Sequence, residues 1–189
     1  MLSTAALGAS SATVHVVEPE PEPEPEPELI AVQKLLTVII TTSPIQSHPS
    51  SKLLEDVLDS FVHIPDLGTC RKLLVCDGFK VIPHKRKDGG GTNNQSKKGL
   101  ISAEVGRRYE EFVDSVTERS SKGVHPFGCG ATEVIRLKKH MGFAYAVKEA
   151  LTRVDTPYVM VVQHDFAFVR PFDLRAVLNA MAAEPEVLK

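Results

Sequence analysis

Apolar runs of strand length alternate along this chain with segments whose apolar residues recur at helical spacing. β-Branched residues dominate residues 35–42, and a second short apolar run lies within residues 71–78. The pattern between them, which Ser50 or Ser51 is placed to cap, predicts a helix with one buried face. Its apolar positions are Leu53, Leu54, Val57, Leu58 and Phe61. This order has the length of a βαβ unit and therefore predicts two parallel strands.

The second half of the chain continues the alternation. Its expected elements are a helix from Ser102, a strand at residues 133–137, a helix at residues 142–153, a strand at residues 158–162, and a helix at residues 173–183 capped by Asp173. We expect the helix at residues 142–153 to bury Phe143, Ala146, Val147, Ala150 and Leu151. The resulting β-α-β-α-β-α-β-α series predicts an α/β fold, a three-layer α/β/α sandwich with a mainly parallel sheet.

Two segments of low complexity precede this series. Residues 18–28 are a strict Glu-Pro alternation, which disfavours a helix and predicts an extended polyproline-II spacer. Residues 1–17, which are small, apolar and hydroxylated, are expected to be a flexible tail. Residues 29–189 are then the folded domain, which we expect to be truncated at its C-terminus. The basic, glycine-rich residues 85–98 lack the order of a phosphate-binding loop and are expected to be solvated.

Charge and composition exclude some classes of function. The net charge is −2, and without the six glutamates of residues 18–28 the remaining 22 basic and 18 acidic residues give +4, too weakly basic for a nucleic-acid-binding domain. No run of about 18 apolar residues occurs, so we expect no transmembrane segment. The three cysteines match no zinc or disulfide spacing and are expected to be reduced thiols. Residues 1–17 have no lysine or arginine, so no signal peptide is indicated, and cytoplasmic and Golgi- or ER-associated locations both stay open.

Polar residues follow three of the predicted strands, at the edge where α/β sheets bind ligands. They are Thr41, Thr42 and Ser43 after the first strand, Asp77 after the second, and Gln163, His164 and Asp165 after the fourth. Asp165 and His164 offer an oxygen and an imidazole to Mn²⁺ or another divalent ion. Local chemistry alone favours a turn-capping Asp165 and a surface His164, and it allows Asp77 to be a plain turn residue before Gly78. The remaining loop histidines are expected to be structural or solvated, with no paired carboxylate: His63, His84, His125 and His140.

The order and spacing of these segments resemble the nucleotide-sugar half of a GT-A-fold glycosyltransferase, close to the family-2-like group. Residues 36–43 (LTVIITTS) resemble that family's first strand and nucleoside loop, and residues 74–78 (LVCDG) its second strand. Residues 142–151 (GFAYAVKEAL) resemble its glycine- and alanine-rich helix. The family's Asp-x-Asp metal motif is matched by Gln163-His164-Asp165, so its first aspartate is replaced by Gln163.

The resemblance implies a role for each of these residues. Asp77 would accept the uracil N–H, with Thr41, Thr42 and Ser43 along the nucleoside, and Gly142 would lie beside the donor. Asp165 would hold Mn²⁺ or Mg²⁺, with His164 as a second ligand. Gln163 would hydrogen-bond ribose or sugar hydroxyls. Because Gln163 replaces one carboxylate of the motif, three interpretations of the domain are open. In descending order of preference, they are a weaker metal site, a metal-independent transferase and a degenerate, non-catalytic domain.

The implied activity is the transfer of a hexose or N-acetylhexosamine from a nucleotide-diphosphate sugar. A UDP-sugar is favoured as the donor, and the acceptor is an unknown glycan, protein or small molecule. In the family a further half binds the acceptor and supplies the base of inverting enzymes, so the sequence assigns no catalytic residue here. The alternative function is a non-catalytic, degenerate α/β interaction domain carried on the Glu-Pro spacer.

Overall fold

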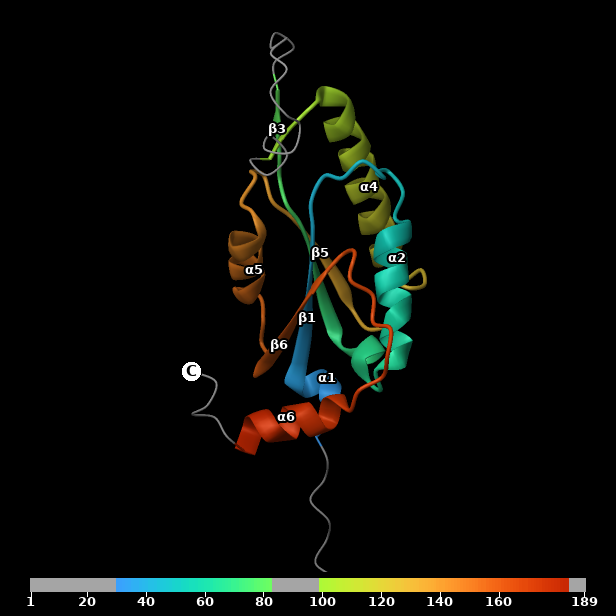
Figure 1. Ribbon diagram of the computed structural model, residues 1–189, viewed down its shortest axis with the longest axis vertical. Coiled ribbons are helices and arrows are strands. Elements are labelled where there is room, and N and C mark those ends of the chain that lie inside the picture. The colour runs from blue at the N-terminus through green and yellow to red at the C-terminus, as the bar shows by residue number, and fades with distance from the viewer. Residues whose placement is uncertain (1–29, 83–98, 184–189) are drawn as a thin grey trace, which may run out of the picture.

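The computed structural model describes residues 30–82 and 99–183 (Figure 1). The predicted tail at residues 1–17, the spacer at residues 18–28 and the loop at residues 85–98 lie outside the described residues. The described elements follow the predicted alternation of strands and helices. No helix within the described ranges is both long and apolar enough to cross a bilayer.

Four parallel strands form the central sheet, in the order β5-β2-β1-β6. Their bounds are β1 (Leu36–Thr42), β2 (Arg71–Cys76), β5 (Thr132–Arg136) and β6 (Tyr158–Gln163). The register pairs Thr41 with Val75 on one side and with Gln163 on the other. The carboxyl ends of β1, β2 and β6 therefore meet at one edge of the sheet, and the predicted parallel sheet is confirmed.

Helices cover both faces of this sheet (Figure 1). On one face lie α2 (Lys52–Asp59) and α4 (Ala103–Ser121), and on the other lies α5 (Phe143–Leu151). Figure 1 shows α6 (Leu174–Ala183) beside α1 (Val32–Leu35), at the end where β1 begins. Two 3₁₀ turns, η1 (Ser60–His63) and η2 (Leu67–Thr69), follow α2, and a small parallel pair is formed by β3 (Lys80–Val81) and β4 (Leu100–Ile101).

The core has two parts because residues along each strand alternate between the faces. The larger part packs Val38 and Ile40 of β1 against α2 and α4. The smaller part packs Ile39 of β1 against Ala146 and Ala150 of α5. Since β1 is buried on both faces, its sequence is a continuous apolar run rather than an alternating one.

The predicted helix starts are borne out to different degrees. The hydroxyl of Ser102 accepts the N–H of Val105 at 3.2 Å, and the carboxylate of Asp173 accepts the N–H of Ala176 at 2.9 Å, so both residues cap their helices. Of the two candidates for α2, the Ser50 hydroxyl accepts the backbone N–H of Lys52, the first residue of the helix, at 3.3 Å, whereas the Ser51 hydroxyl donates to the side chain of Glu55.

The prediction of burial is wrong for three residues: Leu53 is 41% exposed, Phe143 is 55% exposed and Leu151 is 45% exposed. For α5 the reason is its position, because it packs over β1 and β2 through Ala146 and Ala150. Val147 is partly buried against the same cluster, and Phe143, Tyr145 and Leu151 face outward. The same position leaves the outer strand β6 only partly covered, and Val159 and Val161 are half-exposed on the α5 face. The short elements α1, β3 and β4 were not expected from the sequence.

Candidate functional site

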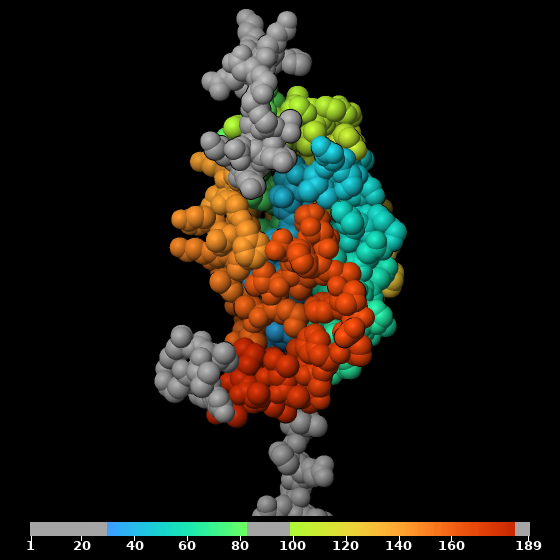
Figure 2. Space-filling view, viewed as in Figure 1, coloured from blue at the N-terminus to red at the C-terminus, as the bar shows by residue number. Residues whose placement is uncertain are grey.

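A cavity of about 270 Å³ lies at the carboxyl ends of β1, β2 and β6, on the face that carries α5. Figure 2 shows β1 recessed between α5 and the segment that follows β6. The lining residues are Thr41, Thr42, Ser43, Asp77, His140, Gly142, Phe143, Ala146, Gln163 and His164. Among the described residues, no lysine or arginine contributes to this lining. The cavity is therefore rich in hydroxyl, amide and imidazole groups and has one carboxylate.

The end of β1 brings hydroxyl groups to the cavity. Thr41 lies opposite Gln163 in the strand register, so both side chains point to the α5 face. Thr42 is 3% exposed, and its Oγ1 has no hydrogen-bond partner among the described residues. A buried hydroxyl without a partner is unfavourable, but the Thr42 side chain points to the same face as Val38 and Ile40, toward α4, so this hydroxyl does not enter the cavity.

Asp77 ties the end of β2 to the start of α5. Its Oδ1 accepts the backbone N–H groups of Gly78 at 2.9 Å and Met141 at 2.7 Å, and its Oδ2 accepts that of Gly142 at 3.0 Å. The residue is only 5% exposed. Asp77 thus places a negative charge at the N-terminus of α5, where the helix dipole favours it. It is more than the plain turn residue that the local sequence allowed.

The residue after Asp77 must be glycine, because the backbone of Lys139 passes close to it. A Cβ atom at Gly78 would lie 2.5 Å from the backbone carbonyl carbon of Lys139, closer than van der Waals contact permits. The chain after β2 therefore passes directly against the segment that leads from β5 to α5. This close approach allows Asp77 to reach the backbone of Met141 and Gly142.

His140 is the site residue that the sequence did not predict. Its Nδ1 lies 2.8 Å from Oδ2 of Asp77, so the expectation that it has no paired carboxylate is wrong. The same expectation fails for His125, whose Nδ1 lies 3.8 Å from Oδ1 of Asp59. Both partners are distant in sequence, and nothing in the local pattern reveals them. The only signal in the sequence was that His140 lies two residues before Gly142.

The turn after β6 places the predicted metal-motif residues in different settings. Nδ1 of His164 lies 3.3 Å from the carbonyl oxygen of Thr41, which also accepts the His164 backbone N–H at 3.1 Å. Gln163 and His164 line the cavity, whereas Asp165 is exposed and outside the lining. The structure thus gathers seven of the eight residues named from the sequence around one cavity and leaves Asp165 beside it.

The groups available to a divalent cation are few. Among residues 30–82 and 99–183, no set of three His, Cys, Asp or Glu side chains gathers as a metal-binding cluster. Mg²⁺ in phosphate-handling sites commonly takes one or two carboxylates and completes its shell with substrate phosphates and water. Asp165 is one exposed carboxylate beside His164, and it lies outside the cavity lining.

A buried imidazole lies behind the cavity. His48 is 1% exposed, and its ring stacks on that of Phe112 with 4.2 Å between the centroids. Its Nδ1 accepts the backbone N–H of Ile45 at 3.2 Å. Burial, together with the nearby positive charge of Arg108 and of His164 when protonated, lowers the pKa of His48 to about 4. His48 is therefore neutral at pH 7.

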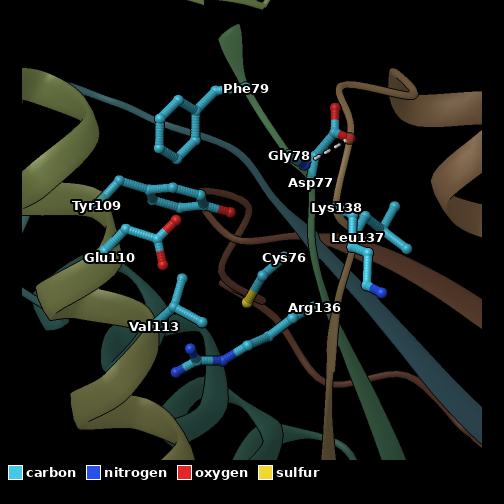
Figure 3. Close-up of a pocket in the computed structure, with 10 residues that line it drawn as sticks. All are labelled: Cys76, Asp77, Gly78, Phe79, Tyr109, Glu110, Val113, Arg136, Leu137 and Lys138. Atoms are coloured by element: carbon cyan, nitrogen blue, oxygen red, sulfur yellow. Dashed lines mark hydrogen bonds between the residues drawn. The ribbon is translucent and has the colours of Figure 1, made fainter. Parts of the chain in front are cut away.

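A second cavity, of about 200 Å³, lies on the opposite side of β2 beneath α4 (Figure 3). Tyr109 and Glu110 of α4 face Cys76 and Arg136 of the sheet, while the carboxylate of Asp77 turns away from them (Figure 3). Burial raises the pKa of Cys76 to about 12, so this thiol stays protonated. Arg136 forms an ion pair with Asp114. The second cavity thus borders the first one without sharing its hydroxyl-rich lining.

Comparison with known proteins adds no identification to this geometry. No family model matches the chain, and no curated protein matches it either.

Proposed function

We propose that the cavity at the carboxyl ends of β1, β2 and β6 binds a nucleotide-diphosphate sugar, with a UDP-sugar favoured, and that the protein transfers this sugar to an acceptor. The observation that carries the proposal is the convergence of Thr41, Thr42, Ser43, Asp77, Gly142 and Gln163 on one cavity. These six are the residues that the resemblance to GT-A glycosyltransferases gives to the donor. Parallel α/β sheets bind ligands at this edge.

The lining suits the neutral parts of such a donor. Threonine and serine hydroxyls and the Gln163 amide both donate and accept hydrogen bonds, as ribose and hexose hydroxyls require. Asp77 already accepts three backbone N–H groups, and a carboxylate has about four acceptor positions, so about one remains for the uracil N–H or a side chain.

The diphosphate requires positive charge from another source, since the described lining has no lysine or arginine. Asp165 with His164 would hold Mn²⁺ or Mg²⁺, which stabilises the charge that develops on a diphosphate leaving group. Gln163 in place of a second carboxylate makes this a weaker metal site. We therefore expect a modest gain in UDP affinity from the cation.

Calorimetric titration with UDP tests this function. The wild-type protein should bind UDP, and Mn²⁺ should increase the affinity by about tenfold, the effect of one charge-assisted contact. In Asp165→Asn, UDP should still bind, but Mn²⁺ should no longer raise its affinity. No UDP binding with or without Mn²⁺ overturns the proposal. An unchanged Mn²⁺ effect in Asp165→Asn removes the metal role alone.

An interaction domain without catalysis is the second candidate, and one observation favours it. Apolar side chains are exposed on α5 and on the edge strand β6: Phe143, Tyr145, Leu151, Val159 and Val161. Exposed apolar patches commonly mark contact surfaces for other proteins. A wild-type protein that fails to bind UDP but associates through this patch, with Tyr145→Ser and Val161→Ser weakening the association, would support this candidate.

A further inference from the structure

We propose that His140, rather than Asp77, reads the nucleobase of the donor: its Nε2 accepts the ring N–H of uracil, so the site selects a uridine nucleotide over a cytidine nucleotide. The inference rests on the function proposed above and names the group behind its preference for UDP. His140 lies in the segment between β5 and α5, and it lines the cavity together with Asp77. The resemblance to GT-A glycosyltransferases gives the uracil N–H to Asp77, and the proposal moves this contact to the neighbouring ring.

The carboxylate of Asp77 has little hydrogen-bonding capacity left for a ligand. Its Oδ1 accepts two backbone N–H groups and its Oδ2 accepts a third. Of about four acceptor positions on a carboxylate, about one therefore remains, on Oδ2. Nδ1 of His140 lies 2.8 Å from that same oxygen. The side chain of Asp77 is 6% exposed against 22% for that of His140, so a ligand in the cavity reaches the imidazole more easily.

The contact between the two side chains decides which nitrogen of His140 carries the proton. An unprotonated Nδ1 would place its lone pair 2.8 Å from Oδ2 of Asp77, which is repulsive. The carboxylate therefore favours the proton on Nδ1, although the contact is not aligned as a hydrogen bond. In the neutral ring, a proton on Nδ1 leaves Nε2 with a lone pair, so Nε2 is a hydrogen-bond acceptor.

The packing of the imidazole ring leaves its Nε2 edge open. Nδ1 is buried. On the other side of the ring, a Cβ atom at Gly99 would lie 2.7 Å from Cδ2 of His140, so the backbone of Gly99 covers that atom. Gly99 has a φ of +68°, a conformation that other residues rarely adopt, so this close contact is built into the backbone. The exposed part of the side chain therefore lies at Cε1 and Nε2.

This acceptor distinguishes uracil from cytosine. Uracil carries a hydrogen on N3, whereas N3 of cytosine carries a lone pair. Nε2 of His140 therefore forms a hydrogen bond with uracil and faces a second acceptor in cytosine. A site built to pair one polar group discriminates against the analogue that lacks it, because the polar group of the site is then left unpaired. A methyl group on N3 of uracil removes the same hydrogen.

The other imidazole of the lining, His164, lies at a different part of the cavity. It follows β6, whereas Asp77 follows β2, and β1 lies between these two strands. Neighbouring strands are about 4.8 Å apart, so the ends of β2 and β6 are about 10 Å apart. The resemblance places the base at the end of β2, and His140 is the imidazole beside that end.

The test is a calorimetric comparison of UDP, CDP and N3-methyl-UDP at pH 8. The wild-type protein should bind UDP at least about tenfold more tightly than either analogue, the effect of one hydrogen bond. In His140→Leu, UDP affinity should fall by about tenfold, to the level of CDP, while CDP affinity stays within about twofold of wild type. His125→Leu is the matched control, because His125 is also a loop histidine beside a carboxylate, Asp59, and lies outside the cavity. It should keep the wild-type preference.

A second measurement needs no variant and decides the question even if His140→Leu does not fold. In wild-type protein labelled with ¹⁵N-histidine, UDP should shift the Nε2 signal of His140 more strongly than CDP does. Equal affinity of the wild type for all three nucleotides overturns the inference, and so do a UDP preference retained in His140→Leu, which leaves the base with Asp77, and an Nε2 signal that UDP does not move. A wild-type protein that binds none of the three overturns the proposed function itself.

Discussion

Asp77, at the end of β2, accepts the backbone N–H of Gly142, the N-cap of α5, at 3.0 Å. One carboxylate thereby joins the central sheet to the helix that forms one wall of the cavity. Gly142 has a φ of +76°, a left-handed conformation that glycine adopts without strain, and this brings its N–H toward Asp77. The shape of the cavity therefore depends on a contact between two segments far apart in the sequence.

Removing this carboxylate should destabilise the fold. Asp77→Ala leaves the N–H groups of Gly78, Met141 and Gly142 without their acceptor at a site that is 5% exposed. We expect the free energy of unfolding to fall by about 3 kcal/mol, the scale of an unsatisfied buried group. Urea unfolding measures this. Asp165→Ala is the control: Asp165 is exposed, so its removal should change stability by less than about 0.5 kcal/mol. Equal losses in the two variants would contradict this account of Asp77.

Thr42→Val should separate stability from binding. Valine has nearly the same shape as threonine and removes the buried Oγ1 that has no partner among the described residues. We expect stability to rise by about 1 kcal/mol because the desolvation penalty of the hydroxyl disappears. UDP affinity should stay within about twofold of wild type, because the hydroxyl points to the face that packs on α4 and does not reach the cavity. Thermal unfolding and calorimetry measure the two effects, and a large loss of affinity would show that the Thr42 hydroxyl contacts the ligand.

His48 should make stability depend on pH. Its pKa is about 4 in the fold against 6.5 in the unfolded chain, so between these values the unfolded state takes up a proton that the folded state does not. Its effect is absent above pH 6.5, and stability falls as the pH drops, by about 3 kcal/mol once the pH reaches 4. Urea unfolding between pH 7 and pH 4 follows this change.

His48→Phe is the matched variant for that measurement. Phenylalanine keeps an aromatic ring against Phe112 and Tyr109 but does not titrate. The variant should lose less stability than wild type over the same pH interval. An identical pH dependence in the two proteins would show that other groups, not His48, govern the acid sensitivity.

The three cysteines should differ in reactivity in the folded protein. Burial raises the pKa of both Cys70 and Cys76, which disfavours their reactive thiolates, whereas Cys129 is exposed. Iodoacetamide at pH 8 should therefore modify Cys129 first, at least about tenfold faster than the other two. Peptide mass mapping identifies the modified residue. Rapid modification of Cys76 would contradict its place in the core beneath α4.

The sequence was sufficient to predict the parallel sheet, but it predicted the site only in part. Buried parallel strands such as β1 are continuous apolar runs, and the polar residues that end them meet because parallel carboxyl ends share an edge. This reasoning placed Thr41, Asp77 and Gln163 at one location. It missed His140, because its pairing with Asp77 depends on how the segment before α5 passes Gly78, and no local pattern records that approach.

The errors in burial have a related cause. Periodicity identifies the apolar side of α5, but it does not tell which strands the helix covers. Because α5 lies over β1 and β2, its outer residues Phe143 and Leu151 are left exposed, and the edge strand β6 is only partly covered. Helix position over a sheet is set by packing in three dimensions, here by the small residues Ala146 and Ala150.

The most direct test of the central claim is to locate UDP by NMR, from the backbone amide signals of the ¹⁵N-labelled protein. If the cavity at the ends of β1, β2 and β6 is the nucleotide site, saturating UDP with Mg²⁺ should shift the signals of Thr42, Ser43, Gly142 and Gln163 most strongly. UDP that leaves these four signals unmoved, or that instead shifts those of Glu110 and Lys138 in the second cavity, would contradict the account.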